Sequence, residues 1–234
     1  MEFRKQRTSF RLPPPIQQQQ EDRQWRRHGP LLPNSIRAII SGPSNSGKTH
    51  LMVGLLFHPN GLRFQNCYIY CKTLHQPKYQ FVEAVLKEIP SAELQMFDNR
   101  EQVCPPEEIR PDSVVIFDDV ASENQELMRQ YFARGRHYGL DTFYLCQSYA
   151  RVPKHLIRDN ANVVFLFRQD DLNVRHVYED HARSDMPLET FRQLCSAAWN
   201  NDKYGYVVID AESPVSRGRY RRGLDEFWQC PKAK

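Results

Sequence analysis

Two kinds of segment alternate along the middle of the chain: short apolar runs, and longer segments whose apolar residues recur every three or four positions. The first kind predicts buried strands and the second predicts helices. The expected strands cover 36–42, 66–71, 113–119, 141–147, 162–168 and 204–211. The expected helices cover 48–57, 78–88, 123–137, 171–181 and 187–198. Because strands alternate with helices, the pattern predicts an α/β fold with a largely parallel central sheet and helices on both faces.

The two ends of the chain differ from this middle part in composition. Residues 1–30 contain the proline and glutamine run LPPPIQQQQEDRQ, which cannot pack a core. Residues 1–30 and residues 213–234 each have a net charge of +4, and the whole chain also has +4, so residues 31–212 are net acidic. We therefore predict a flexible basic arm at 1–30, one folded domain at 31–212 and a basic tail at 213–234.

The tail contains SRGRYRRG at 216–223, which interleaves arginine with tyrosine and suits phosphate contact combined with stacking. For both ends, a solubilising segment that contacts nothing is the open alternative. No apolar run approaches the roughly 18 residues that span a membrane, and MEFRKQRTSF lacks a secretory segment, so we expect a soluble intracellular protein without membrane contact. The six cysteines form no C-x-x-C pair, and Cys67, Cys71 and Cys146 fall in strand-like runs, which indicates reduced core thiols.

The segment GPSNSGKT at 42–49 joins the first expected strand to the first expected helix and fits the pattern G-x-x-x-x-G-K-[ST]. A strand, a glycine loop and a helix start form a phosphate cradle, because backbone N–H groups and the helix dipole meet the anion there. We expect Lys48 to reach the β- and γ-phosphates of ATP and the Thr49 hydroxyl to hold Mg²⁺. The predicted nucleotide-binding residues are Gly42, Pro43, Ser44, Asn45, Ser46, Gly47, Lys48 and Thr49.

A second half of such a site follows in SVVIFDDV at 113–120, an apolar run that ends in two carboxylates. We expect Asp118 to bind the metal through water and Asp119 to polarise the attacking water, with Glu123 as the next candidate base. Gln147 ends the next strand, where its side chain is expected to hydrogen-bond the γ-phosphate or that water. Together these residues predict a RecA-like P-loop NTPase core.

Other P-loop classes lack their usual features here. The chain has no guanine-reading N-K-x-D, no room for a second helicase core and no long arginine-bearing lid. In YFARGRHYG, at 131–139, Arg134 and Arg136 stand at a predicted helix end, where the helix dipole alone favours cations. Alternatively, such an arginine acts in the neighbouring subunit's site, as in ring ATPases. Since no arginine is placed to act in its own site, we expect an oligomer and take Arg136 as the candidate finger.

The ordered segments GPSNSGKT, VVIFDD, ARGRHYG and YLCQSYARVPKHLIRDNANVVFLFR resemble the genome-packaging ATPases of large DNA viruses, virophages and Polinton-type elements. These ATPases belong to the FtsK/HerA superfamily of DNA-translocating motors. The similarity covers residues 35–212, and KTLHQPKYQF at 72–81 shares it. At Asp119 the sequence departs from many superfamily members, which have Glu.

The resemblance implies ATP hydrolysis in a ring, often of five or six subunits, that drives double-stranded DNA into a preformed capsid. It implies nucleotide and metal binding by Lys48, Thr49 and Asp118, catalysis by Asp119, a sensor role for Gln147 and a trans finger in Arg136. Capsid proteins and a location at the virus assembly site or in the virion follow from the same resemblance. The alternative is an ATP-switched DNA- or capsid-binding assembly protein without processive translocation, which would stall after binding.

Overall fold

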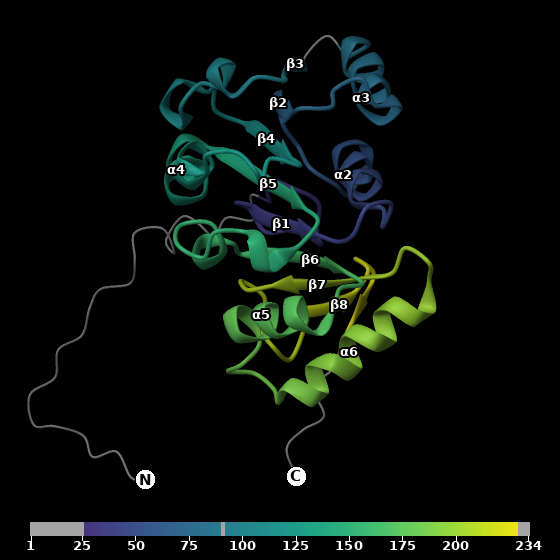
Figure 1. The fold of residues 1–234 in the computed structure, drawn as a ribbon. Helices are drawn as coiled ribbons and strands as arrows, with labels where there is room; N and C mark the ends of the chain where they lie inside the picture. Colours follow the sequence, from purple (N-terminus) through teal and green to yellow (C-terminus); the bar gives the residue numbers. More distant parts are fainter. Residues whose placement is uncertain (1–25, 90–91, 229–234) are drawn as a thin grey trace, which may run out of the picture.

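The structure is a computed structural model that describes residues 26–89 and 92–228, and in these ranges one sheet runs through the whole molecule (Figure 1). The six strands from β3 to β6 in the sheet are parallel, and β7, β8 and β9 follow, each antiparallel to the strand before it. This confirms the predicted α/β class with a largely parallel sheet. In sheet order the strands are β3 (Glu93–Phe97), β2 (Asn66–Cys71), β4 (Ser113–Asp118), β5 (Leu140–Cys146), β1 (Arg37–Ser41), β6 (Val163–Phe167), β7 (Tyr206–Asp210), β8 (Tyr220–Arg222) and β9 (Glu226–Phe227).

Helices cover both faces of the sheet, as the sequence predicts. On one face lie α2 (Lys48–Phe57) and α3 (Pro77–Lys87); on the other lie α4 (Glu126–Arg134), α5 (Asp171–His181) and α6 (Leu188–Asn201). Short 3₁₀ helices connect them: η1 (Arg100–Gln102), η2 (Pro106–Glu108), η3 (Gly135–Tyr138), η4 (Tyr149–Arg151) and η5 (Arg158–Asn160). Among the described helices, none combines the length and the apolar character needed to cross a bilayer.

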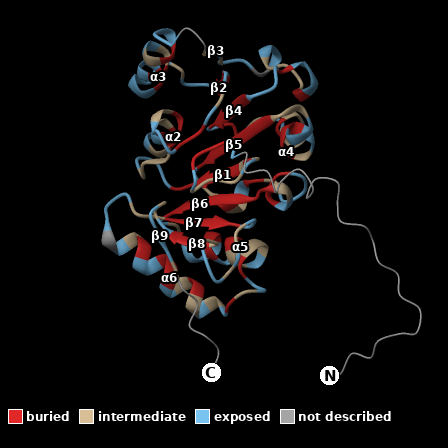
Figure 2. Ribbon diagram, turned by 180° about the vertical axis from the view of Figure 1, so that it is seen from behind, coloured by how far each residue is buried: buried red, intermediate tan, exposed pale blue. Residues whose placement is uncertain are grey.

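The central strands are buried along their whole length because both of their faces are covered (Figure 2). Their sequences are therefore continuous apolar runs without alternation, as expected for strands in the middle of a parallel sheet. Cys67 and Cys71 in β2 and Cys146 in β5 are buried free thiols, which confirms their predicted place in the core. Burial raises the pKa of the Cys67 and Cys146 thiols to about 12.

Most predicted elements match the observed ones to within one residue, and three differ by two or three residues at an end; one of these is the expected helix 187–198, which is observed as Leu188–Asn201. The expected helix 123–137 begins only at Glu126, because the preceding residues form a turn in which the Gln125 amide donates to the carbonyl oxygens of Val120 (2.7 Å) and Glu123 (2.9 Å). It ends at Arg134 and continues as η3. The expected strand 204–211 begins at Tyr206.

The prediction of a flexible arm needs correction at its inner end. His28 is 1% exposed, and its Nε2 lies 2.9 Å from Oδ2 of the fully buried Asp141. Arg27 also points to Asp141, at 3.4 Å, and donates to the carbonyl oxygen of Gly139 at 2.7 Å. Arg27 and His28 are thus held at the start of β5 by their contacts with Asp141 and Gly139, whereas residues 1–25 lie outside the described residues.

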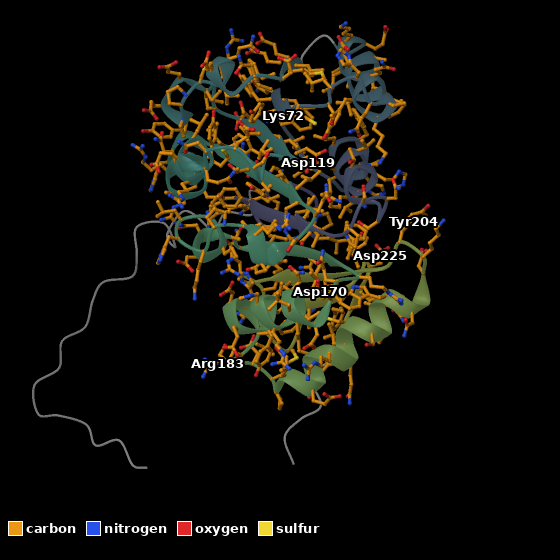
Figure 3. The ribbon with its side chains drawn as sticks, viewed as in Figure 1. Lys72, Asp119, Asp170, Arg183, Tyr204 and Asp225 are labelled. Atoms are coloured by element: carbon orange, nitrogen blue, oxygen red, sulfur yellow. The ribbon has the colours of Figure 1, made fainter. Side chains whose placement is uncertain are left out.

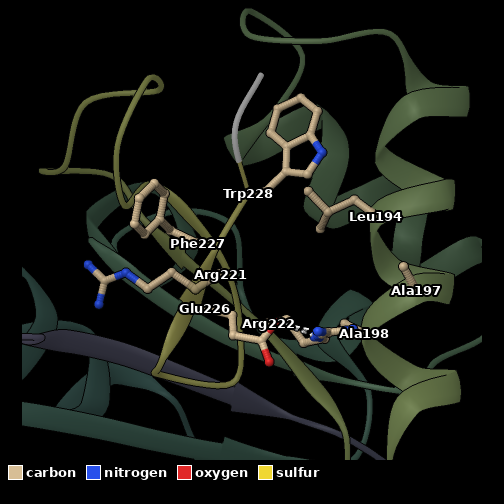
Figure 4. Close-up of a pocket in the computed structure, with 8 residues that line it drawn as sticks. All are labelled: Leu194, Ala197, Ala198, Arg221, Arg222, Glu226, Phe227 and Trp228. Carbon is tan, nitrogen blue, oxygen red and sulfur yellow. Dashed lines mark hydrogen bonds and ion pairs between the residues drawn. The ribbon is translucent and has the colours of Figure 1, made fainter. Parts of the chain in front are cut away.

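The prediction of a tail from residue 213 onward also needs correction, because β8 and β9 extend the sheet. Tyr220 is fully buried, and its ring contacts Trp228 edge-on. Arg221 donates to Asp210 of β7 at 2.8 Å, and Figure 4 shows Arg222 and Glu226 paired across the β8–β9 turn, beside α6. Arg221 and Arg222 therefore make contacts within the chain, although the sequence pattern alone suggested that they bind phosphate. Residues 229–234 lie outside the described residues.

This packing predicts different stability effects for two neighbouring arginines. The side chains of Arg221 and Asp210 are 8% and 5% exposed, so Arg221→Ala leaves a buried carboxylate unpaired and should lower the free energy of unfolding by about 3 kcal/mol or more. Arg222→Ala breaks a solvent-exposed pair on the same strand and should cost less than about 1 kcal/mol. Chemical denaturation measures both values. Equal, small losses would show that β8 is not part of the folded core.

Candidate active site

A tight loop between β1 and α2 contains the predicted phosphate-binding residues 42–49. The Gly42 N–H donates to the carbonyl oxygen of Cys146 at 3.1 Å, which ties the start of the loop to the end of β5. A Cβ at Gly42 would lie 2.6 Å from the Cβ of Phe167, so only glycine fits there. Gly47 has φ 106° and Asn45 has φ 61°, both in the left-handed region that glycine and asparagine tolerate best. The backbone path itself thus requires the two glycines of the motif.

The first turn of α2 points its free N–H groups into this loop. Its N-cap is Gly47, which has no capping side chain, and no acidic residue lies in the first turn, so no side chain of that turn competes for the N–H groups or repels an anion. Thr49 is 8% exposed in that turn. Pro43, Ser44 and Asn45 are exposed at the loop tip, and Ser46 is half-buried.

Lys48 lies across the same loop. Its Nζ donates to the carbonyl oxygens of Gly42 (2.7 Å) and Pro43 (2.8 Å). Partial burial lowers the pKa of Lys48, while the carboxylates of Asp118 and Asp119 act in the opposite direction. The ammonium group therefore stands between the phosphate loop and the two acids.

Strand order brings the remaining predicted residues to the same edge of the sheet as the loop, the edge at which the carboxyl ends of the parallel strands lie. β5 lies between β1, which precedes the loop, and β4, which ends at Asp118, so Gln147 after β5 falls between the loop and the acids. The Gln147 amide donates to Asp119 Oδ1 at 3.3 Å. Asp119 is exposed and has φ 56°, which turns its carboxylate away from the strand path of Asp118.

Asp118 has a different environment from Asp119. It is 7% exposed and accepts a short hydrogen bond from the Tyr79 hydroxyl of α3. Burial raises the pKa of the Asp118 carboxyl, and the Tyr79 hydroxyl and the Lys48 ammonium oppose that rise. Burial and the Asp118 charge raise the pKa of Tyr79 far above its usual range, so the phenol stays protonated and remains a donor. The pair is thus one buried, oriented carboxylate and one exposed carboxylate.

Sequence reasoning missed several residues around this edge. Tyr79 and Lys78 come from the start of α3, and the positive charge of Lys78 lowers the pKa of both Lys48 and Asp118. Lys72 follows β2 and pairs with Glu123, close to Asp119 (Figure 3). All three lie in the segment 72–81, which shares the family resemblance, but the sequence assigns none of them a role because only the parallel sheet brings them to the site.

Gln169 is a further residue of this edge, and it follows β6. Its amide donates to the Gln147 carbonyl oxygen at 3.0 Å and to Ser41 Oγ at 3.3 Å. The rule that selected Gln147, a polar residue at a strand end, also applies to Gln169 and would have found it.

Arg136 lies elsewhere. It is exposed in η3, which precedes the amino end of β5, whereas loop 42–49 follows the carboxyl end of the parallel neighbour β1. Burial and, second, the positive charge of Arg136 lower the pKa of Arg37 at the start of β1, which fixes Arg136 to that edge. Arg136 and Lys48 therefore lie at opposite ends of the parallel strands.

Because Asp118 is buried and Asp119 is exposed, we predict different effects for substitutions at these two carboxylates. Asp119→Asn keeps a residue type that tolerates φ 56° and should retain nucleotide binding while turnover falls by about 10² to 10⁴, the usual contribution of a positioned base. Asp118→Asn should also weaken Mg²⁺ binding, so that turnover requires a higher Mg²⁺ concentration. Glu123→Gln is the matched control and should keep most turnover, because Glu123 is paired with Lys72. Steady-state ATPase assays with Mg²⁺ titration measure all three, and full activity of Asp119→Asn would place the base elsewhere, with Glu123 next.

The fold and this edge together define an α/β protein of the P-loop NTPase type. No family model matches the chain, and no curated protein matches its sequence. Among solved structures, the fold is similar to the genome packaging NTPase B204 from Sulfolobus turreted icosahedral virus 2. In complex with AMP, that protein gives a TM-score of 0.56 at 11% identity over 80% of this chain and 96% of that chain. The complex with sulfate gives a TM-score of 0.54 at 13% identity over 77% of this chain and 94% of that chain. The complex with ATP-gammaS gives a TM-score of 0.50 at 10% identity over 76% of this chain and 93% of that chain. At these identities the similarity concerns the fold.

Proposed function

We propose that the chain is an ATP-hydrolysing motor of the FtsK/HerA superfamily that translocates double-stranded DNA and packages a viral or virus-like genome into a capsid. The observation that supports this most is the convergence of Lys48, the Asp118 and Asp119 pair and Gln147 at one edge of the sheet. The similarity in fold to a viral genome packaging NTPase favours the same class.

In this proposal loop 42–49 binds ATP and positions its phosphates. The Lys48 ammonium exchanges its two carbonyl acceptors for β- and γ-phosphate oxygens, and the first-turn N–H groups of α2 donate to the anion. Mg²⁺ in such sites is held by one or two side-chain oxygens plus phosphate and water, and Thr49 and the oriented Asp118 form a donor set of that kind. When bound, the ion supplies charge neutralisation at the phosphates.

Hydrolysis is assigned to the exposed pair beside the loop. Asp119 accepts a proton from the attacking water, and Gln147, now hydrogen-bonded to Asp119, orients that water or the γ-phosphate. The Gln147 carbonyl oxygen also accepts a hydrogen bond from Gln169, so a movement of Gln147 on loss of the γ-phosphate would be transmitted to the end of β6. Lys72, held by Glu123, adds positive charge beside Asp119.

We infer further that the active form is a ring of five or six subunits. In such a ring Arg136 of one subunit completes the Lys48 site of the next, which accounts for the placement of the two residues at opposite ends of the parallel strands. Double-stranded DNA would be the track and capsid proteins the docking partners. The protein would then act at the site of virus assembly or in the virion.

ATP turnover by the purified full chain, with and without long duplex DNA, tests this function. A motor should hydrolyse many ATP molecules per subunit and do so faster on long duplex DNA than without it. Turnover that DNA leaves unchanged would contradict a DNA-driven cycle.

A further inference from the structure

A groove of about 380 Å³ runs along one side of α2 and opens directly beside the phosphate loop. We call it the α2 groove. It begins at Gly47 and continues along the helix, and the segment before β7 and the β8–β9 turn form its opposite wall. The residues used below are Gly47, Leu51, Gly54, Tyr204, Tyr206 and Leu224, all of which line it. Its volume and mostly apolar lining are those of a small-molecule site.

Tyr204 stands where this groove meets the phosphate loop. A Cβ at Gly47 would lie 3.3 Å from its Cδ1, so the ring lies against the loop backbone. The residue is nevertheless 48% exposed, and Lys203 lies over the ring at 5.3 Å from its centroid. An exposed aromatic ring with a cation beside it, next to a phosphate cradle, offers a stacking surface for a base.

Gly54 gives a second, independent observation. It stands in the interior of α2, where glycine is less favourable than alanine. A Cβ added there would meet no atom within 4 Å, and the residue faces the α2 groove. Neither the turn geometry nor the packing of the helix thus requires glycine at this position. Glycine leaves this side of the groove open, and a larger side chain would fill it.

We propose that the α2 groove holds the nucleobase of the bound nucleoside triphosphate, with the base stacked on Tyr204 and lying past Gly54. This rests on the proposed nucleotide-binding function of loop 42–49. Phosphates bound by the loop would leave the sugar and base to extend along α2, and the groove is the cavity that continues from Gly47 in that direction. The C-terminal β8–β9 turn, which contributes Leu224, thereby becomes a wall of the nucleotide site.

The test compares binding of ATP with binding of inorganic tripolyphosphate, which has the phosphates but no base. Calorimetric titrations use the full chain, and thermal unfolding verifies each fold. Gly54→Leu fills the groove without a clash at Cβ and should raise the Kd for ATP at least tenfold while the Kd for tripolyphosphate stays unchanged. Gly54→Ala is the matched smaller change and should have a weaker effect. Leu172→Ala, at an exposed site on α5, should alter neither affinity.

Tyr204 provides a second arm. Tyr204→Ala removes the ring and should raise the Kd for ATP about fivefold or more, again without affecting tripolyphosphate, whereas Tyr204→Phe retains a stacking ring and should lose less. Unchanged ATP affinity in both Gly54→Leu and Tyr204→Ala would overturn the base site while leaving the phosphate cradle intact. A wild-type chain that binds neither ATP nor tripolyphosphate would instead refute the proposed nucleotide site, and the base site with it.

Discussion

Lys48→Ala is expected to fold normally and to lose essentially all ATP turnover. The Lys48 ammonium donates to two carbonyl oxygens of its own loop, and the buried Asp118 carboxylate beside it keeps its hydrogen bond from Tyr79 when Lys48 is removed. In the transition state of phosphoryl transfer, negative charge spreads over the γ-phosphoryl oxygens, and a positioned cation there is worth several powers of ten in rate. The expected phenotype is therefore a stable protein without catalysis.

The comparison needs a lysine of similar type outside the site. Lys87 is exposed at the end of α3 and pairs with Glu83, so Lys87→Ala should retain wild-type turnover. Thermal unfolding and steady-state ATPase assays of the three proteins separate a loss of fold from a loss of catalysis. A soluble Lys48→Ala protein with near-normal ATPase activity would refute the site assignment.

Arg136→Ala is expected to bind ATP almost normally and yet to turn over about 10³ to 10⁵ times more slowly, the range found for arginine fingers that act in trans. The reason is geometric: Arg136 and Lys48 lie at opposite ends of the parallel strands, so under the proposed ring Arg136 would act on the nucleotide of a neighbouring subunit. Arg134→Ala, two residues earlier and also exposed, is the matched control and should have a smaller effect. Equilibrium ATP binding and single-turnover hydrolysis measure the two steps separately.

Mixing the two inactive variants sharpens this prediction. An intact Lys48 site facing an intact Arg136 neighbour reappears only in mixed oligomers, so combining Lys48→Ala with Arg136→Ala subunits should restore part of the ATPase activity. Partial rescue is the result expected of subunits that exchange and fire independently. A fully active Arg136→Ala oligomer would contradict the trans finger, and the helix dipole would then account for an arginine at this position.

The central part of the fold was predictable because its hydrophobic pattern is local and strong. The runs that became β2, β4, β5 and β6 are fully buried, so nearly every residue in them is apolar. β3 was missed because it is a half-exposed edge strand with the mixed sequence ELQMF. β8 was missed because its charged residue Arg221 is neutralised by Asp210 on the neighbouring strand, a contact that spacing along the chain does not reveal.

The candidate site was predictable to the extent that its residues follow strand ends. Gly42, Lys48, Asp118 and Gln147 are each placed by the strand before them, so a correct assignment of strands sufficed. Tyr79 reaches Asp118 from a helix 39 residues earlier, and no sequence signal specifies such a contact. The sequence thus predicts the site residues that follow strand ends. The tertiary structure adds the side chains that orient those residues.

ATP-dependent displacement of a third-strand oligonucleotide from long duplex DNA tests the central claim, DNA translocation, most directly. The account predicts that the wild-type oligomer displaces the oligonucleotide after a delay that increases with its distance along the duplex, and that Lys48→Ala displaces none. Binding of the oligomer to DNA with hydrolysis that stops after about one ATP per subunit, and with the oligonucleotide left in place, would contradict translocation and identify an ATP-switched assembly protein instead.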